Sequence, residues 1–296
     1  MRTHPLYGVL LAFVGALVLT PDTLFMRLSG MEAASMLAWR GLLMGAALIG
    51  VWLILAGTAA WGELRSLASR AGLIVVTCQV LNAVLFNAGI AVAPVAPVLL
   101  GLATVPVFSA ITAYLIGGER IRPATVITIV LVMAGITLAV LGHDQEGVTL
   151  DGRAIFGALA GLSVAIAFAI SFAVLRNTPS LALLPTMGTG ALLAGTAGLL
   201  FAGPSALFAG EVWAIAISGG VILPISFVLL MAATRHTHPS NVSLLLLLET
   251  VLGPIWVWWG IGEELTGPVI IGGIIVVVSL AGYIIHLRRI APAQAV

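Results

Sequence analysis

Of all the side chains in this sequence, a carboxyl group in the middle of an apolar segment is the best placed to bind a ligand or a proton. Glu249 lies inside residues 242–260, which read VSLLLLLETVLGPIWVWWG and are long enough to cross a lipid bilayer. A charge near the bilayer centre costs at least about 2.5–3.5 kcal/mol, so such a group is expected to face a protein interior or a water-filled cavity. It could attract a substrate ammonium group, or it could bind and release a proton. A protonated acid hydrogen-bonded to a neighbouring helix is the structural alternative.

Helical spacing places further polar and aromatic side chains on single faces of other apolar segments. Gln79, Asn82 and Phe86 recur at i, i+3 and i+7, so one face carries two amides and a ring. Amides can bond both ends of a zwitterion, and rings offer apolar contact to a side chain. Interhelical hydrogen bonding is the alternative role, and it is favoured for Thr104 and Ser163. The candidate substrate-binding residues are Gln79, Asn82, Phe86, Thr104, Ser163, Glu249 and Trp256.

Two ionisable residues lie near the same end of the first two apolar segments and form a second candidate group. Asp22 and Arg40 lie at matching depth if both segments are helical, so we expect them to pair and neutralise each other. A structural clamp is the favoured interpretation of this ion pair, and an outer gate is the alternative. Arg40 could equally offer its guanidinium group to a substrate carboxylate.

The composition is that of a membrane protein. Hydrophobic residues make up 61% and charged residues 8% of the chain, whereas a soluble domain averages about 25% charged residues. The net charge of +1 gives no electrostatic case for nucleic acid binding, and the absence of lysine excludes Schiff-base chemistry. Cys78 is the single cysteine, and the five histidines fall at segment ends or in connections, so no metal site, no cofactor and no enzyme activity are expected.

The elements that must position these side chains are ten apolar segments of membrane-spanning length. The Pro21-Asp22 pair and the lack of a small-residue cleavage site indicate that the first is a retained helix. The predicted segments are Leu6–Met26, Ala34–Ala56, Gly72–Val92, Pro97–Gly117, Ala124–Gly142, Ile155–Leu175, Leu181–Ala202, Val212–Ala233, Val242–Gly260 and Pro268–Leu287.

Charge placement predicts the orientation. With ten crossings, nine arginines fall on the side that carries both termini and only Arg27 and Arg153 on the other side, while acidic residues show the reverse bias. The positive-inside tendency therefore predicts cytoplasmic N- and C-termini.

The chain also repeats itself. Residues 97–123 superpose on 241–268 with an offset of 144, which aligns Gly118-Glu119 with Gly262-Glu263. We therefore predict an all-α integral membrane protein with ten transmembrane helices, built as two five-helix repeats, 1–147 and 148–296, around a central cavity. Because five is odd, the repeats lie oppositely in the membrane, an arrangement that suits a midplane site reached alternately from either side.

Three short motifs carry a resemblance that spans essentially the whole chain. LAWR at 37–40, VPV at 105–107 before LIGGER at 115–120, and LETV at 248–251 before Gly262-Glu263 resemble motifs of the EamA-type, ten-helix branch of the drug/metabolite transporter superfamily. Thr250 stands where that branch usually has proline, with Pro254 one turn later, so the kink beside Glu249 is expected to be displaced. The resemblance implies export of metabolites, notably amino acids, and LTPDTLFMR at 19–27 resembles the amino-acid exporters.

The sequence thus predicts a secondary transporter of the cytoplasmic (inner) membrane that exports amino acids or closely related small metabolites by alternating access. The expected partners are that small-molecule substrate and the lipid bilayer, with the chain acting as a monomer; protons as coupling ions and facilitated diffusion both stay open. Export of apolar organic cations, bound by Glu249 and the tryptophans, is the alternative substrate. A channel is the alternative class, although no charged ring or filter-like segment is present.

Overall fold

All regular elements in the described part of the chain are helices. The computed structural model describes residues 5–57, 60–93, 98, 101–118, 121–141, 152–262 and 267–290. The helices are α1 Pro5–Leu19, α2 Asp22–Ser29, α3 Ala33–Ala56, α4 Ala60–Leu67, α5 Arg70–Val92, α7 Val105–Gly117, α8 Pro123–Leu141, α9 Gly152–Asn177, α10 Leu183–Phe201, η2 Ala206–Phe208, α11 Val212–Ile217, η3 Ser218–Ile222, α12 Leu223–Ala233, α13 Pro239–Leu246, α14 Leu248–Ile261 and α15 Gly267–Ile290.

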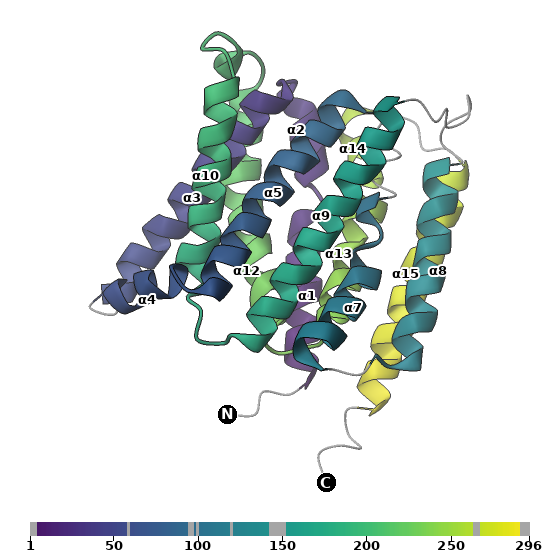
Figure 1. Ribbon diagram of the computed structural model, residues 1–296. Coiled ribbons are helices and arrows are strands. Elements are labelled where there is room, and N and C mark those ends of the chain that lie inside the picture. The colour runs from purple at the N-terminus through teal and green to yellow at the C-terminus, as the bar shows by residue number, and fades with distance from the viewer. Residues whose placement is uncertain are drawn as a thin grey trace.

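The bundle has the length and apolarity of a membrane domain. Within the described ranges, seven helical segments are long and apolar enough to cross a membrane, and three further apolar helices are shorter. Figure 1 shows α3 beside α10 at one side of the bundle and α8 beside α15 at the other. The protein is therefore an all-α, multi-pass integral membrane protein, and these helices correspond to the predicted segments.

The connections alternate between the two ends of the bundle. In Figure 1, α1 begins and α15 ends at the lower end, where α4 and the connections after α9 and α12 also lie. Arg65, Arg70, Arg176 and Arg235 belong to this end. Arg2 and Arg120, as well as the acidic residues in 142–151 and 263–266 that entered the orientation prediction, lie outside the described residues.

Several crossing segments are interrupted within their length. The first breaks at Thr20–Pro21, since proline has no amide hydrogen for the helix ladder. The eighth contains the π-helix η3 directly before Pro224, and the ninth ends and restarts at Leu247 (φ −67°, ψ −8°). The ninth helix therefore breaks before Glu249, and α14 runs on through Pro254, so the break is not at that proline.

Two glycines end corresponding helices. Gly118 (φ +65°) closes α7 and Gly262 (φ +80°) closes α14, in the left-handed conformation that glycine adopts without a steric penalty. Turns also interrupt the two segments at Ala103–Thr104 and at Leu247, again 144 residues apart.

Helix pairs correspond between the halves in the same way. α5 packs on α9 as α1 packs on α12, while α3 packs on its own counterpart α10 and α8 on its own counterpart α15. These pairs are what two related five-helix halves would produce. The predicted boundary at residues 147 and 148 lies outside the described residues, so the division itself stays a prediction.

The closest helix packing joins α3 and α10 through glycines. A Cβ atom on Gly41 would lie 2.5 Å from the Cα atom of Gly195, and one on Gly195 would lie 2.4 Å from the amide nitrogen of Leu42. Only hydrogen fits at this crossing, which is the role of small residues in membrane helix pairs. The crossing sets the position of α3, which carries Arg40.

Adding one methyl group at this crossing is expected to destabilise the protein. Gly41→Ala should cost about 1–3 kcal/mol because the two backbones must separate. Gly50→Ala is the matched control on the same helix: its Cβ would meet nothing within 4 Å, so a neutral or stabilising effect is expected. The free energy of unfolding, measured in detergent by titration with denaturant, compares the two, and equal losses would contradict the packing argument.

The lower half of the bundle is filled with side chains. Phe168 packs against Phe172 and Phe227, with ring centroids 5.6 and 6.0 Å apart. Because α9 runs downward in Figure 1, Phe172 lies one turn closer to the lower end than Phe168. The large side chains with less than 2% exposure include several from the ends of α9, α10, α12 and α13 nearest this end and from the connection after α9: Phe172, Leu175, Leu181, Met187, Leu230, Met231 and Leu244.

A chain of hydrogen bonds ties α8 and α15 to the ninth segment. The Tyr283 hydroxyl donates to Asn241 Oδ1 at 2.7 Å, and it also bonds Thr125 Oγ1 at 2.7 Å. Asn241 Nδ2 in turn donates to Thr237 Oγ1 at 2.7 Å. These buried polar groups satisfy one another, which accounts for them without a ligand.

A short helix missing from the predicted segments lies between α3 and α5. This helix, α4, lies in the interval between the second and third predicted segments, and its Trp61 is 80% exposed. The Trp52 indole nitrogen donates to Glu63 Oε2 at 2.5 Å, which fastens α4 to the end of α3. An exposed tryptophan beside Arg65 is typical of a helix lying in a membrane interface.

Candidate functional site

A cavity of about 100 Å³ lies between helices from both halves of the chain. Six of the nine candidate residues from the sequence line it together. They are Asp22, Arg40, Gln79, Asn82, Phe86 and Glu249. Two further rings, from Phe168 and Phe227, and mostly aliphatic side chains complete the wall. A few polar groups set in an apolar wall are typical of a small-molecule site.

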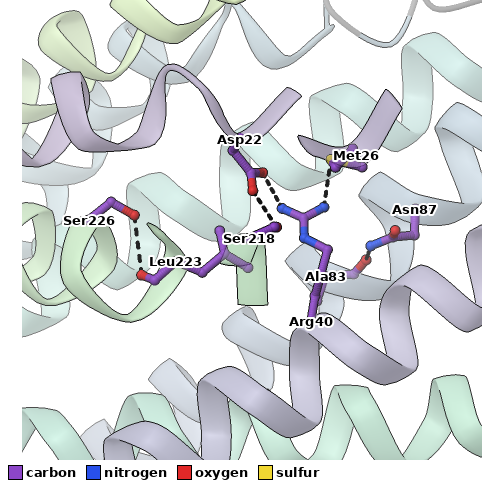
Figure 2. A network of polar contacts seen from close by, with 8 residues as sticks. All are labelled: Asp22, Met26, Arg40, Ala83, Asn87, Ser218, Leu223 and Ser226. Carbon is purple, nitrogen blue, oxygen red and sulfur yellow. Dashed lines mark hydrogen bonds and ion pairs between the residues drawn. The ribbon is translucent and has the colours of Figure 1, made fainter. Parts of the chain in front are cut away.

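An ion pair joins the first two crossing segments at the cavity. Arg40 Nη2 donates to Asp22 Oδ2, and the Ser218 hydroxyl donates to the other carboxylate oxygen, Oδ1 (Figure 2). The side chains of Asp22 and Arg40 are 3% and 11% exposed, so both charges are largely shielded from solvent. Arg40 Nη1 also contacts the sulfur of Met26 at 2.8 Å. The carboxylate is therefore fully engaged and neutralises the guanidinium group.

Local backbone geometry positions this cluster. Asp22 is the first residue of α2, where the helix dipole favours a negative charge. Ser218 starts the π-helix η3, and a Cβ on the next residue, Gly219, would come within 2.7 Å of the Arg40 Cα atom. Glycine at this position thus lets α3 approach the π turn closely enough for the three side chains to meet.

Glu249 enters the cavity from the first turn of α14. The helix restarts at Leu248, so the carboxyl group lies beside amide groups at a helix N-terminus, which favours a negative charge. No hydrogen bond or ion pair to Glu249 is found among the described residues. Asp22 and Arg40 line the same cavity, and because they neutralise each other, an ionised Glu249 leaves the site with one uncompensated negative charge.

The two predicted amides face the same space from α5. Gln79 and Asn82 are 6% and 9% exposed, yet neither forms a side-chain hydrogen bond within the described part of the chain. The ring of Phe86 lies on the same face, one turn above Asn82. These groups can donate and accept hydrogen bonds in the cavity.

The structure places three candidates away from the cavity, each with its polar atom engaged elsewhere. Thr104 and Ser163 donate to carbonyl oxygens of their own segments, Gly101 O at 2.6 Å and Leu159 O at 2.8 Å. Ser163 is exposed on the outer surface of α9.

The polar atom of the third candidate, Trp256, is also engaged outside the cavity. Its indole nitrogen donates to Thr20 Oγ1 at 2.9 Å, at the interruption between α1 and α2. Glu249 and Trp256 share the uninterrupted helix α14, but only Glu249 lines the cavity.

Asn87 is a cavity residue that the stripe on the third segment omitted. It follows Gln79 by eight positions, so continuing the spacing i, i+3, i+4, i+7 and i+8 would have included it. No helical spacing in the sequence indicated Ser218, because the direction of its side chain depends on the π turn. Within the described residues, no group of three histidine, cysteine, aspartate or glutamate side chains is arranged to hold a metal ion.

Comparisons with known proteins agree with this architecture. Residues 6–141, from α1 to the end of α8, match the model of the EamA-like transporter family, a family of multi-span membrane transporters in the drug/metabolite transporter superfamily. A protein of known crystal structure is similar to this chain with a TM-score of 0.77 and 19% identity, over 96% of this chain and 98% of its own. That likeness concerns the fold alone. No curated protein matches the chain.

Proposed function

We propose that this protein is a secondary transporter that exports amino acids or closely related small metabolites by alternating access. The cavity lining supports this proposal, because it combines amides without a hydrogen-bond partner among the described residues, a carboxyl group and phenylalanine rings in an apolar surrounding. Gln79 and Asn82 can bond the carboxylate or the ammonium group of a zwitterion, and Glu249 can attract the ammonium group. The rings of Phe86 and Phe168 offer a surface to an apolar side chain.

The interrupted helices support a transport mechanism. Discontinuous membrane helices that expose backbone groups beside a central site are typical of secondary transporters. The breaks at Pro21, η3 and Leu247 adjoin Asp22, Ser218 and Glu249 respectively, so bending at these points changes the surroundings of the polar groups. The filled lower half of the bundle is consistent with a conformation closed at that end.

The orientation is part of the proposal. Arginines gather at the lower end of Figure 1, which we assign to the cytoplasm by the positive-inside tendency. The cytoplasmic (inner) membrane is the proposed location, and the chain is proposed to act as a monomer of two repeats, 1–147 and 148–296. Glu249 is the proposed proton carrier if transport is coupled to a proton gradient.

Export of apolar organic cations is the second candidate. The carboxyl group of Glu249 favours it, since in its ionised form a carboxylate in an apolar wall with three phenylalanines attracts a cation. The tryptophans are less suited to this role than the sequence indicated: Trp256 bonds Thr20, and Trp259 is 74% exposed. A channel is less well supported, because the sequence contains no charged ring or filter-like segment.

Counterflow in proteoliposomes tests the proposed function. Vesicles containing the purified protein and an unlabelled amino acid are expected to accumulate the labelled form above protein-free vesicles, in a panel that includes leucine, phenylalanine and threonine. An imposed pH gradient then separates proton-coupled transport from facilitated diffusion. Accumulation of a labelled organic cation, with no amino acid moving, would replace the proposed substrate class by the second candidate.

A further inference from the structure

Asn87 lines the cavity and carries one acceptor atom whose orientation is fixed. The residue lies on α5, lines the cavity and is 7% exposed. Its Nδ2 atom donates to the carbonyl oxygen of Ala83 at 2.8 Å, as Figure 2 shows. Its Oδ1 atom is buried and has no hydrogen-bond partner among the described residues.

The orientation of this amide follows from its neighbour. Exchanging Nδ2 and Oδ1 would place two acceptor oxygens against each other, since the Ala83 carbonyl cannot donate. The nitrogen must therefore face Ala83, and the oxygen is left to receive a hydrogen bond. Buried acceptors are rarely left without a partner, and this one belongs to a residue that lines the cavity, so a molecule bound there is a candidate partner.

Another residue that lines the cavity, Arg40, carries a complementary donor. Arg40 Nε is buried without a partner in the described part of the chain, although the two terminal nitrogens of Arg40 reach Asp22 and Met26. Figure 2 shows Arg40 and Asn87 on neighbouring helices, α3 and α5. The two unpartnered atoms do not bond each other, so an occupant that supplies a donor to one and an acceptor to the other satisfies both.

We propose that Asn87 is a specificity-determining residue that accepts an N–H hydrogen bond from the ammonium group of the substrate. The inference rests on the proposed function, because it takes the cavity as the transport site, and it narrows the substrate class. Primary ammonium groups have the required hydrogen and quaternary ammonium groups do not. Arg40 Nε is the matching donor for a carboxylate on the same substrate.

Binding of three related probes to the purified protein tests this assignment. The probes are leucine, its decarboxylated amine 3-methylbutylamine and its deaminated acid 4-methylpentanoate, each titrated by calorimetry. Asn87→Leu is expected to weaken the binding of leucine and of the amine by about 10- to 100-fold, the loss of one hydrogen bond to a charged group. The deaminated acid should bind unchanged.

The chain supplies a matched control. Asn177 on α9 makes the same bond to the carbonyl four residues earlier, Ala173 O at 2.8 Å, but it is exposed and lies outside the cavity. Asn177→Leu should leave all three titrations unchanged.

The outcomes separate this assignment from the proposed function. Equal weakening of all three probes by Asn87→Leu, or an unaffected amine, would overturn the role of Asn87. Wild-type protein that binds the amine but not leucine would overturn amino-acid transport, while the amine titration still decides the role of Asn87. Wild-type protein that binds none of the probes overturns both.

Discussion

Replacing Glu249 with glutamine is expected to abolish the response of transport to an imposed pH gradient. Glutamine keeps the shape and hydrogen-bonding capacity of the side chain, but it carries no charge and does not take up a proton at the pH of the assay. Gradient-driven accumulation should therefore fall to the level of facilitated exchange, while counterflow of a zwitterion at equal pH continues. The apparent affinity for an organic cation should drop about 10- to 100-fold.

An exposed acid provides the comparison for this substitution. Glu211 bonds the Trp213 indole at 3.0 Å on the surface and does not line the cavity. Glu211→Gln should therefore transport as the wild type does, with and without the gradient. Unaltered gradient-driven accumulation by Glu249→Gln would exclude this residue as the proton carrier.

The second large effect concerns the ion pair of Asp22 and Arg40. Removing one partner strands a buried charge, so Asp22→Asn or Arg40→Gln alone should each destabilise the protein by about 3–5 kcal/mol. The double variant leaves no stranded charge and should be more stable than the sum of the two losses predicts, by about 0.5–3 kcal/mol. Titration with denaturant in detergent measures the free energy of unfolding of the wild type, the two single variants and the double variant.

Arg65, which is exposed at the lower end, serves as the control for loss of a positive charge. Arg65→Gln should change stability little. Strict additivity of the Asp22 and Arg40 substitutions would mean that the two charges do not stabilise each other. A double variant that is stable yet transports poorly would identify a role for the pair in the transport cycle.

The helical, membrane-spanning character of the chain follows from composition and length alone. Apolar runs such as 212–233 can only be helical in a bilayer, because each backbone amide needs a partner within the segment. For this reason the predicted Val212–Ala233 coincides with the range from α11 to α12. What composition did not reveal was the interruption inside such runs: the break at Leu247 has no proline or glycine in the preceding turn to announce it.

The candidate site was predictable where the helix spacing is regular. Gln79, Asn82 and Phe86 share one face of the uninterrupted α5, so the periodic pattern placed them together. Trp256 was grouped with Glu249 on a similar stripe, but its indole nitrogen had a partner at Thr20, which is distant in the sequence. Such pairings depend on how helices cross, and a single sequence does not encode them in its periodicity.

The π turn of the eighth crossing segment allows one helix to contact both the Asp22 carboxylate and the cavity. Ser218 and Phe227 are separated by about two and a half turns of a regular α-helix, which would direct them to opposite sides. The wider turn at Ser218–Ile222 rotates everything that follows it, so Ser218 can reach Asp22 while Phe227 still lines the cavity. Deleting one residue from this turn would restore a uniform helix and separate those two contacts. The π turn thus connects the ion pair to the part of the cavity wall that Phe227 forms.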